Sequence, residues 1–239
     1  MLYNDAMSAS RPYFAYIALV GLLALLVLIV FFPQSVAKSY HYLSIDVDIT
    51  VDRDATLTVS ETLTQEFQGV FHQSSRYIPL DNLSSIEVLG VVDGENHQAF
   101  SFSPERLDKT DPKSWGKYTT YSEKNQFFIE WYFHEENTIH SWTITYKVPD
   151  GVRVESGSAI LDWNVFTGYH VPIDAASVAV HLPEVSATDK LGISASSERE
   201  EWSGSVADGR TLKATRADVP GTGSFRVLAT FPEEALKRP

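Results

Sequence analysis

Two contrasting patterns of apolar residues divide the chain. Phe14 to Phe32 is an uninterrupted apolar run, FAYIALVGLLALLVLIVFF, without a charged residue. As a helix it would rise about 28 Å, close to the ~30 Å hydrocarbon core of a bilayer. After it, apolar and polar residues alternate strictly over Leu43–Asp52, which is typical of a half-buried β-strand. The pattern therefore predicts one membrane helix followed by β-structure.

The alternating segments predict a mainly β fold, an antiparallel β-sandwich. Turn residues at 52–55 separate the first strand from a second alternating run at 57–67, so we expect these two to form a hairpin. No segment after residue 40 shows a 3.6-residue apolar stripe, and segments 103–114 and 189–209 are expected as exposed loops, the second with room for a short strand. Short strands without intervening helices are typical of packed antiparallel sheets. Further strands are expected at 85–92, 98–102, 127–133, 142–148, 159–163, 177–182 and 225–231.

These patterns predict five regions: a cytoplasmic tail (1–11), a transmembrane helix or signal anchor (12–32), a linker (33–39), an extracytoplasmic β-sandwich domain (40–232) and a C-terminal tail (233–239). Small residues at Ser35, Val36 and Ala37 would also suit a signal peptidase cutting after Ala37. The apolar run is longer than the 7–15 residues usual in a cleaved signal, which favours a retained, single-pass anchor. Both alternatives place the β domain outside the cytoplasm.

Charge and cysteine content restrict the partners. The chain has 19 basic and 31 acidic residues, a net charge of −12, and no charge at all between Pro12 and Ala37. An acidic surface disfavours nucleic acid and anionic lipid headgroups as partners. Without cysteine the exported domain has no disulfide, so its stability must come from a buried core.

Glu61 is a charged residue at an apolar position. It has the same parity as Val59 and Leu63, so regular alternation places it in the core. A lone buried carboxylate is costly, and Arg76 is the candidate partner for a structural ion pair. A bulge turning Glu61 to solvent and a ligand-binding or catalytic carboxylate remain alternatives.

Two aromatic residues suggest a surface for carbohydrate. Trp115 and Tyr118 lie around Gly116 in polar, loop-like sequence, so we expect them to be exposed and able to stack on sugar rings. Trp163, inside a predicted strand, is expected in the core.

Patterns that would indicate an enzyme, a cofactor or a metal site are incomplete. His134-Glu135-Glu136 begins like a zinc-protease motif, but position 138 is Thr138 rather than histidine. The sequence has no G-x-S-x-G nucleophile elbow and no phosphate-cradling glycine loop. Asp46 and Asp48 share a strand face and are expected to be solvated. We therefore expect no catalytic residue, no cofactor and no metal.

An ordered set of short motifs from about Ser39 to Phe231 resembles a known family. The motifs are Val59-Ser60-Glu61, Phe67-Gln68-Gly69, Ser75-Arg76-Tyr77-Ile78-Pro79, Ile144-Thr145-Tyr146-Lys147-Val148, Leu161-Asp162-Trp163-Asn164-Val165, Gly168 and Val180-His181-Leu182-Pro183. Together they resemble the exported N-terminal region of the predicted membrane protein family called domain of unknown function 2207. The resemblance implies a prokaryotic envelope protein with an extracytoplasmic β-rich domain. It implies no activity, and it departs from the family in that members usually continue into further membrane helices.

The leading interpretation is a protein of the cell membrane with a non-enzymatic domain outside the cytoplasm. Its partners would be the lipid bilayer, through residues 12–32, and another envelope protein. The alternative is a module that binds cell-surface glycan through Trp115 and Tyr118.

Overall fold

The computed structural model describes residues 16, 17, 19, 37–81, 83, 85–166, 169–196, 202–221 and 223–237. Among these, no helix is long and apolar enough to span a bilayer. The predicted membrane segment 12–32 lies outside the described residues except for Tyr16, Ile17 and Leu19, which are helical. Residues 38–239 form one compact unit.

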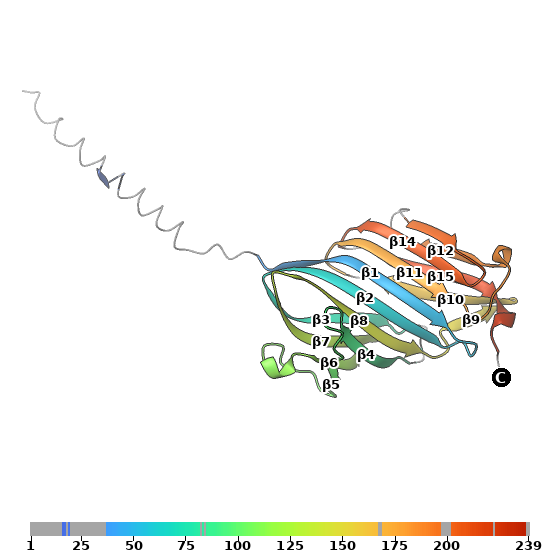
Figure 1. Ribbon diagram of the computed structural model, residues 1–239, viewed down its shortest axis with the longest axis horizontal. Coiled ribbons are helices and arrows are strands. Elements are labelled where there is room, and N and C mark those ends of the chain that lie inside the picture. Colours follow the sequence, from blue (N-terminus) through green and yellow to red (C-terminus); the bar gives the residue numbers. More distant parts are fainter. Residues whose placement is uncertain are drawn as a thin grey trace, which may run out of the picture. The chain divides into compact units, whose positions relative to one another are not determined.

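Three β-sheets build this unit (Figure 1). The main sheet has the order β13 (Trp202–Val206), β14 (Thr211–Val219), β11 (Ile173–His181), β1 (Ser39–Val51), β2 (Leu57–Gln68), β8 (Ile139–Val148) and β4 (Glu87–Asp93). The β10 sheet has the order β12 (Gly192–Ser196), β15 (Phe225–Pro232), β10 (Ser158–Phe166) and β9 (Val152–Glu155). The β3 sheet has the order β3 (Val70–Pro79), β7 (Gln126–Glu136), β6 (Lys117–Glu123) and β5 (Ser101–Phe102). Three short 3₁₀ turns are the helical elements described in this unit: η1 (Pro112–Ser114), η2 (Thr188–Lys190) and η3 (Glu233–Ala235).

Both four-stranded sheets pack on the same face of the main sheet. Trp142 of β8 stacks on Phe133 of the β3 sheet, with ring centroids 4.4 Å apart. Four residues further along β8, Tyr146 contacts Trp163 of the β10 sheet, with ring centroids 6.1 Å apart. One cluster of buried residues therefore continues beneath both small sheets. Trp163 is in this core, as its sequence position indicates.

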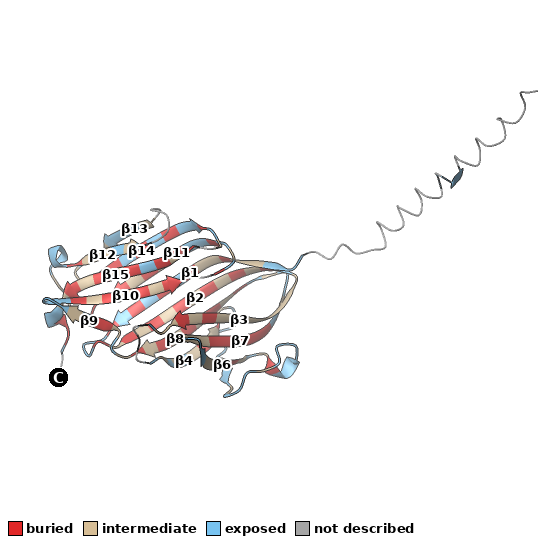
Figure 2. Ribbon diagram, turned by 180° about the vertical axis from the view of Figure 1, so that it is seen from behind, coloured by how far each residue is buried: buried red, intermediate tan, exposed pale blue. Residues whose placement is uncertain are grey.

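Alternation along the strands determines which side chains enter the core. Buried and more exposed residues alternate along the long strands in Figure 2. In β1 a bulge between Tyr42 and Ser44 reverses the parity. Tyr42 is consequently buried and Leu43 is not, although alternation continued from Ile45 would have placed Leu43 inside.

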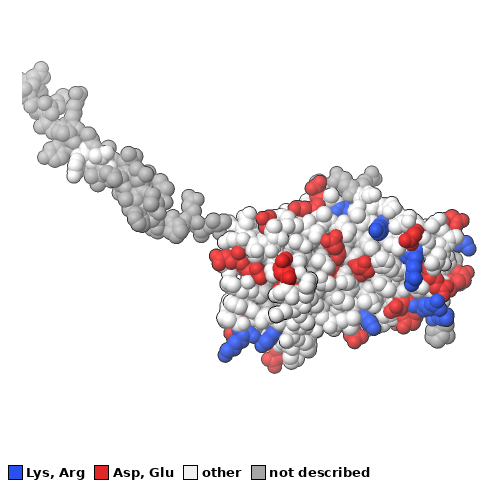
Figure 3. Space-filling view, viewed as in Figure 1, with Lys and Arg blue, Asp and Glu red and all other residues white. Residues whose placement is uncertain are grey.

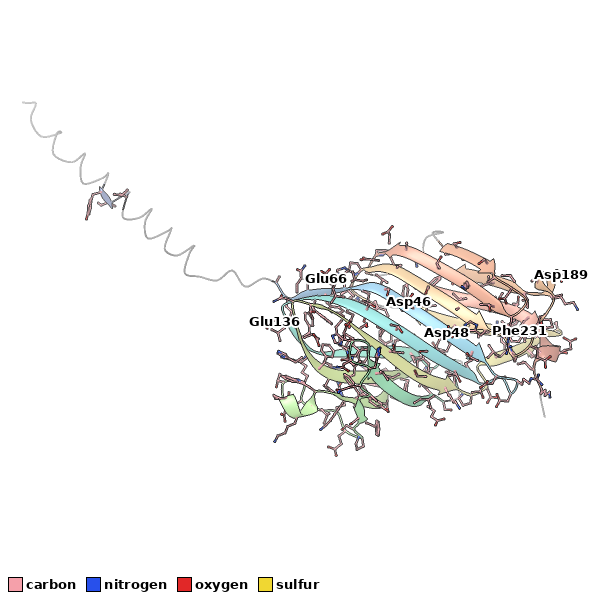
Figure 4. All side chains as sticks on the ribbon, viewed as in Figure 1. Asp46, Asp48, Glu66, Glu136, Asp189 and Phe231 are labelled. Atoms are coloured by element: carbon pink, nitrogen blue, oxygen red, sulfur yellow. The ribbon has the colours of Figure 1, made fainter. Side chains whose placement is uncertain are left out.

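The opposite face of the main sheet is open to solvent. Acidic side chains and a few basic ones are scattered over it among uncharged residues (Figure 3). Asp46 and Asp48 project from β1 into this face, as expected (Figure 4). Asp46 accepts a hydrogen bond from Ser177 Oγ at 2.6 Å, and Asp48 is 3.0 Å from His181 Nε2.

The mainly β fold and the first hairpin are confirmed, but a purely antiparallel arrangement is wrong. β1 pairs with β11, and β5 with β6, in parallel. β3, β6, β9 and β14 were not predicted, and segment 189–209 contains two strands, β12 and β13. The predicted C-terminal tail is partly packed, because Leu236 is buried and Lys237 N–H donates to Arg53 O at 2.7 Å.

Candidate functional site

A buried ion pair lies in the core between β2 and β3. Glu61 and Arg76, which the sequence pairs, are in contact: Arg76 Nε donates to Glu61 Oε2 at 2.6 Å and Nη2 donates to Oε1 at 3.0 Å. The Tyr146 hydroxyl donates to the same Oε1. The exposed fractions are 0% for Glu61 and 1% for Arg76. Glu61 therefore faces the core, and the alternative of a bulge that exposes it is wrong.

The electrostatics of this network favour the charged form of Arg76 and the protonated form of Tyr146. Burial alone would lower the pKa of Arg76, but the neighbouring Glu61 carboxylate raises it well above its usual value. Burial and the same carboxylate raise the pKa of Tyr146, so its hydroxyl stays protonated and acts as a donor. A closed network of this kind is typical of a structural pair, since a buried charge is tolerated when it is both paired and hydrogen-bonded.

Arg76 also bridges the two small sheets. β3 is an edge strand, and β10 pairs with β9 only along its first half, so each of the two strands has an unpaired edge. Arg76 Nη2 donates to Asn164 O at 3.2 Å and Val165 O at 3.0 Å, and Nη1 donates to Tyr77 O. We call the line between β3 and β10 the seam. A single guanidinium thus closes it at its midpoint.

On the N-terminal side of Arg76 along β3 the seam opens into a groove of about 400 Å³. Tyr42, Gln65 and Phe67 of the main sheet contribute to its floor, and β3 forms one side. Tyr169 and His170 line it as well. We call this space the seam groove. Aromatic rings make up much of its lining, from Tyr40, Tyr42, Phe67, Phe71, Tyr77 and Tyr169.

Gln65 gives the seam groove an unsatisfied hydrogen-bonding group. Its side chain is 0% exposed, and neither its amide nitrogen nor its amide oxygen has a partner among the described residues. The buried Tyr169 hydroxyl also lacks one there. Leaving such a group unpaired costs about 1–3 kcal/mol, so a buried carboxamide beside an open groove is a candidate ligand-binding group.

The charge of the seam groove is opposite to that of the chain. Lys38 and Lys109 line it, and no carboxylate is among the lining residues that the structure describes. Burial raises the pKa of Tyr42 well above its usual value and that of Tyr169 to about 12, so both hydroxyls remain neutral. The groove is therefore locally cationic in a chain of net charge −12.

An aromatic stack stands at the rim. Trp115 is half-buried, and its indole stacks on His134 at 4.6 Å and on His72 at 5.4 Å between ring centroids. The two imidazoles also stack on each other, with their Nδ1 atoms 3.3 Å apart. Trp115 Nε1 donates to Lys109 O at 3.1 Å, which ties the loop at 103–114 to this cluster.

Tyr118 does not join Trp115 in a platform, so that expectation is wrong. Tyr118 is 7% exposed and belongs to the core cluster. It pairs in register with Trp131, whose ring contacts Trp142 of the main sheet. Trp115 instead stacks on His134, on the other face of the β3 sheet, because successive side chains of a strand alternate between faces.

A second pocket of about 500 Å³ lies at the other end of the seam. Two arginines pair with two of its four carboxylates. Asp162 accepts from Arg226 Nε at 2.6 Å and from Arg153 Nη1 at 3.1 Å, and Arg153 also contacts Glu155 at 2.8 Å. The hydrogen bonds from Arg226 lower the pKa of Asp162 against the opposing effect of partial burial. Asp81 and Asp150 also line this pocket and form no ion pair among the described residues, so its excess charge is negative, opposite to that of the seam groove.

The histidines do not converge on a metal site in the described part of the chain, where no group of three or more His, Cys, Asp or Glu has suitable geometry. The two residues of the protease-like fragment have separate partners. His134 stacks on Trp115, whereas Glu135 lies 3.3 Å from His140, whose other nitrogen is 2.9 Å from Asp93.

Comparison with known proteins identifies the family. The model of the predicted membrane protein (DUF2207) N-terminal domain matches residues 42–231, so the chain belongs to this family. No curated protein sequence matches.

Solved structures share only a distant likeness with the chain. A protein from Parabacteroides distasonis, provisionally described as a protease, is 10% identical over 81% of this chain and 40% of its own, with a TM-score of 0.45. The M1 zinc metallopeptidase from Deinococcus radiodurans is 12% identical over 79% and 42%, with a TM-score of 0.41. A protein from Legionella pneumophila, provisionally described as nutrient-binding, is 8% identical over 80% and 67%, with a TM-score of 0.45. The chain spans about two fifths of the length of the two peptidase-like chains, and at these TM-scores none of the three assigns it an activity.

Proposed function

We propose that this chain is a non-enzymatic binding protein of the cell envelope. Residues 12–32 hold it in the membrane, its β domain lies outside the cytoplasm, and the seam groove binds an envelope protein. Membership of a family of predicted membrane proteins and the charge-free apolar run support the anchor. The observation that carries the binding role is Gln65, a fully buried carboxamide that lacks a partner among the described residues and lines an open groove.

The location is tested on washed membranes and intact spheroplasts. A retained anchor gives an intact mass near 26.7 kDa in the membrane fraction, and external protease digests the β domain. A soluble product that begins at Lys38 would show that the N-terminal segment is a cleaved signal rather than a retained anchor. Protection of the β domain from external protease would overturn the proposed location.

The binding role is tested by photo-crosslinking in cells. A crosslinking residue at Gln73, in the seam groove, is expected to give a defined protein adduct that Gln65→Leu diminishes. The same residue at Thr62, on the open face of the main sheet, is the matched control and should not give that adduct. Adducts of equal yield and identity from both positions would contradict binding in the groove.

Trp115 supports a second candidate, a glycan-binding module without Tyr118. Its half-buried indole sits beside Lys109 at the rim of the seam groove. Trp115→Ala would then abolish retention on cell-wall polysaccharide and leave the Gln73 adduct unchanged. Retention unaffected by the substitution would remove this candidate.

A further inference from the structure

The open edge of β3 supplies main-chain hydrogen-bonding groups to the seam groove. β3 pairs with β7 alone, and Tyr77 O points away from β7, toward the seam, where Arg76 binds it. In a strand the N–H and C=O of one residue point to the same edge, and alternate residues share an edge. Ser75 and Gln73, two and four residues before Tyr77, therefore present their N–H and C=O groups to the groove.

Those groups have no other main-chain partner. Apart from the ladder with β7, no backbone hydrogen bond of Gln73 or Ser75 occurs within the part of the chain that the structure describes. Both residues line the seam groove and are only partly exposed. An unpaired strand edge is a template for a further strand. Here the template is short, because Arg76 occupies the seam from Tyr77 onward.

The floor of the groove complements the edge. The buried Gln65 side chain has an unpaired NH2 group and an unpaired carbonyl oxygen, which suits an amide group. The rings of Tyr42, Phe67 and Phe71 beside it suit an apolar or aromatic side chain. An extended peptide meets both needs, because alternate side chains point down toward the floor and away from it.

The charge of the groove selects among peptides. Lys38 and Lys109 line it without a carboxylate among the described lining residues, and Lys38 Nζ lies 4.1 Å from the centre of the Phe71 ring. Acidic side chains of a bound segment would meet these two ammonium groups, whereas basic ones would be repelled.

We propose that the seam groove binds an extended acidic segment of a partner protein, which adds as a strand to β3 at Gln73 and Ser75. This inference rests on the proposed binding function and specifies its ligand. Main-chain pairing favours a peptide over a glycan, since the unpaired N–H and C=O groups are spaced for another strand.

The test uses the full chain in detergent and blocked synthetic heptapeptides that alternate Asp with Val, Phe or Tyr. A matched set has Lys in place of Asp. We expect acidic members to bind at least about tenfold more tightly than their basic counterparts, with affinity falling as salt is added. An acidic peptide N-methylated at alternate residues, which cannot donate to β3, should lose binding. On binding, hydrogen exchange should slow at Gln73 and Ser75 but remain unchanged in β4.

Two kinds of variant complete the test. Gln65→Leu should weaken peptide binding about tenfold or more while leaving the urea midpoint unchanged or higher, because it removes an unpaired buried amide. Gln68→Leu, at the exposed end of β2, is the matched control and should bind normally. Lys38→Gln combined with Lys109→Gln should abolish the preference for acidic over basic peptides.

Three results would overturn this inference: no heptapeptide binds, N-methylation has no effect, or Gln65→Leu binds normally. Polysaccharide occupying the groove in competition with the peptides would also overturn it. If the Gln73 adduct forms in cells while the peptides fail, the strand-addition mode is wrong and the binding function stands. If neither the Gln73 adduct nor peptide binding is observed, both proposals are wrong.

Discussion

Arg76 links the consecutive strands β2 and β3 to the distant strand β10, through its contacts with Glu61 of β2, Tyr77 of β3 and the carbonyls of β10. Replacing Glu61 by Gln leaves the buried guanidinium without its counter-charge. Such a loss costs about 3–5 kcal/mol. We expect Glu61→Gln to lower the melting temperature by roughly 6–20 °C in a domain of this size.

Glu66→Gln is the matched control for that substitution. Glu66 lies on the same strand, its side chain is 40% exposed, and its contact with His41 is 3.5 Å. An exposed pair contributes about 0–1 kcal/mol, so the change should be small. Equal and small shifts for the two variants, read by thermal denaturation, would show that the buried pair does not hold the seam.

Asp162 should give stability a dependence on acid pH. Arg226 and, more weakly, Arg153 keep its pKa below the usual 3.8 in the folded protein. The resulting stability is fully present above about 3.8 and is lost as pH falls through the lower folded pKa. We expect Asp162→Asn to cost roughly 1 kcal/mol at neutral pH, with the difference from the parent protein shrinking near pH 3.

Urea unfolding at both pH values measures this effect. Asp189→Asn, at an exposed position in η2, is the control and should leave the stability at neutral pH almost unchanged. A difference between Asp162→Asn and the parent protein that stays constant down to pH 3 would rule out the pairing with Arg226.

At the residue scale, parity along β2 predicts that Glu61 is buried, and the same parity applies to Gln65. Gln65 is the more informative residue for binding. A polar residue at a core position is therefore a signal that could have found the seam groove. The prediction that Tyr118 is exposed is wrong for the opposite reason. Its polar neighbours suggested a loop, whereas it lies in a strand with one covered face, and its ring points into the core.

At the scale of elements, β3 could not be predicted because its burial pattern does not alternate. From Val70 to Ser75 every residue is of intermediate exposure, and only Arg76 and Ile78 are buried. A strand that borders a groove on one edge has no uniformly apolar face, so period-2 analysis does not detect it. Strands buried on one face, such as β2 and β15, follow the sequence pattern closely.

The β2–β3 turn depends on Gly69. Its φ of +91° is a conformation that residues with a Cβ adopt only under strain, and its N–H donates to Asn137 Oδ1 at 2.8 Å, which holds the turn in this conformation. We expect Gly69→Ala to destabilise the protein by about 1 kcal/mol.

Gly90→Ala provides the contrast for this prediction. A Cβ at Gly90 meets nothing within 4 Å, and the backbone there is not in the left-handed region. The substitution should be neutral or stabilise by up to about 1 kcal/mol, because it restricts the unfolded chain. Urea midpoints that rank the two variants in the reverse order would contradict the assigned turn.

At the scale of the whole molecule, one core beneath two small sheets predicts cooperative unfolding. Trp142 packs against the β3 sheet, and Trp163 packs against Tyr146 from the β10 sheet. The test uses two variants, one whose single tryptophan is Trp142 and one whose single tryptophan is Trp163. Their urea transitions followed by tryptophan fluorescence should coincide with each other and with the transition seen by far-UV circular dichroism. Separate midpoints would mean that the two halves unfold independently.

The parallel pairing of β1 with β11 has a consequence for the order in which the chain can fold during synthesis. The β1–β2 hairpin is local and can form as soon as Gln68 is available. The other edge of β1 stays unpaired for longer, because its partner strand lies far along the chain: Asp46 of β1 is hydrogen-bonded to Ser177, 131 residues later. Throughout that interval the strand that becomes the centre of the main sheet is an exposed edge and a site for aggregation. The main sheet is therefore completed around β1 only when the late strand β11 arrives.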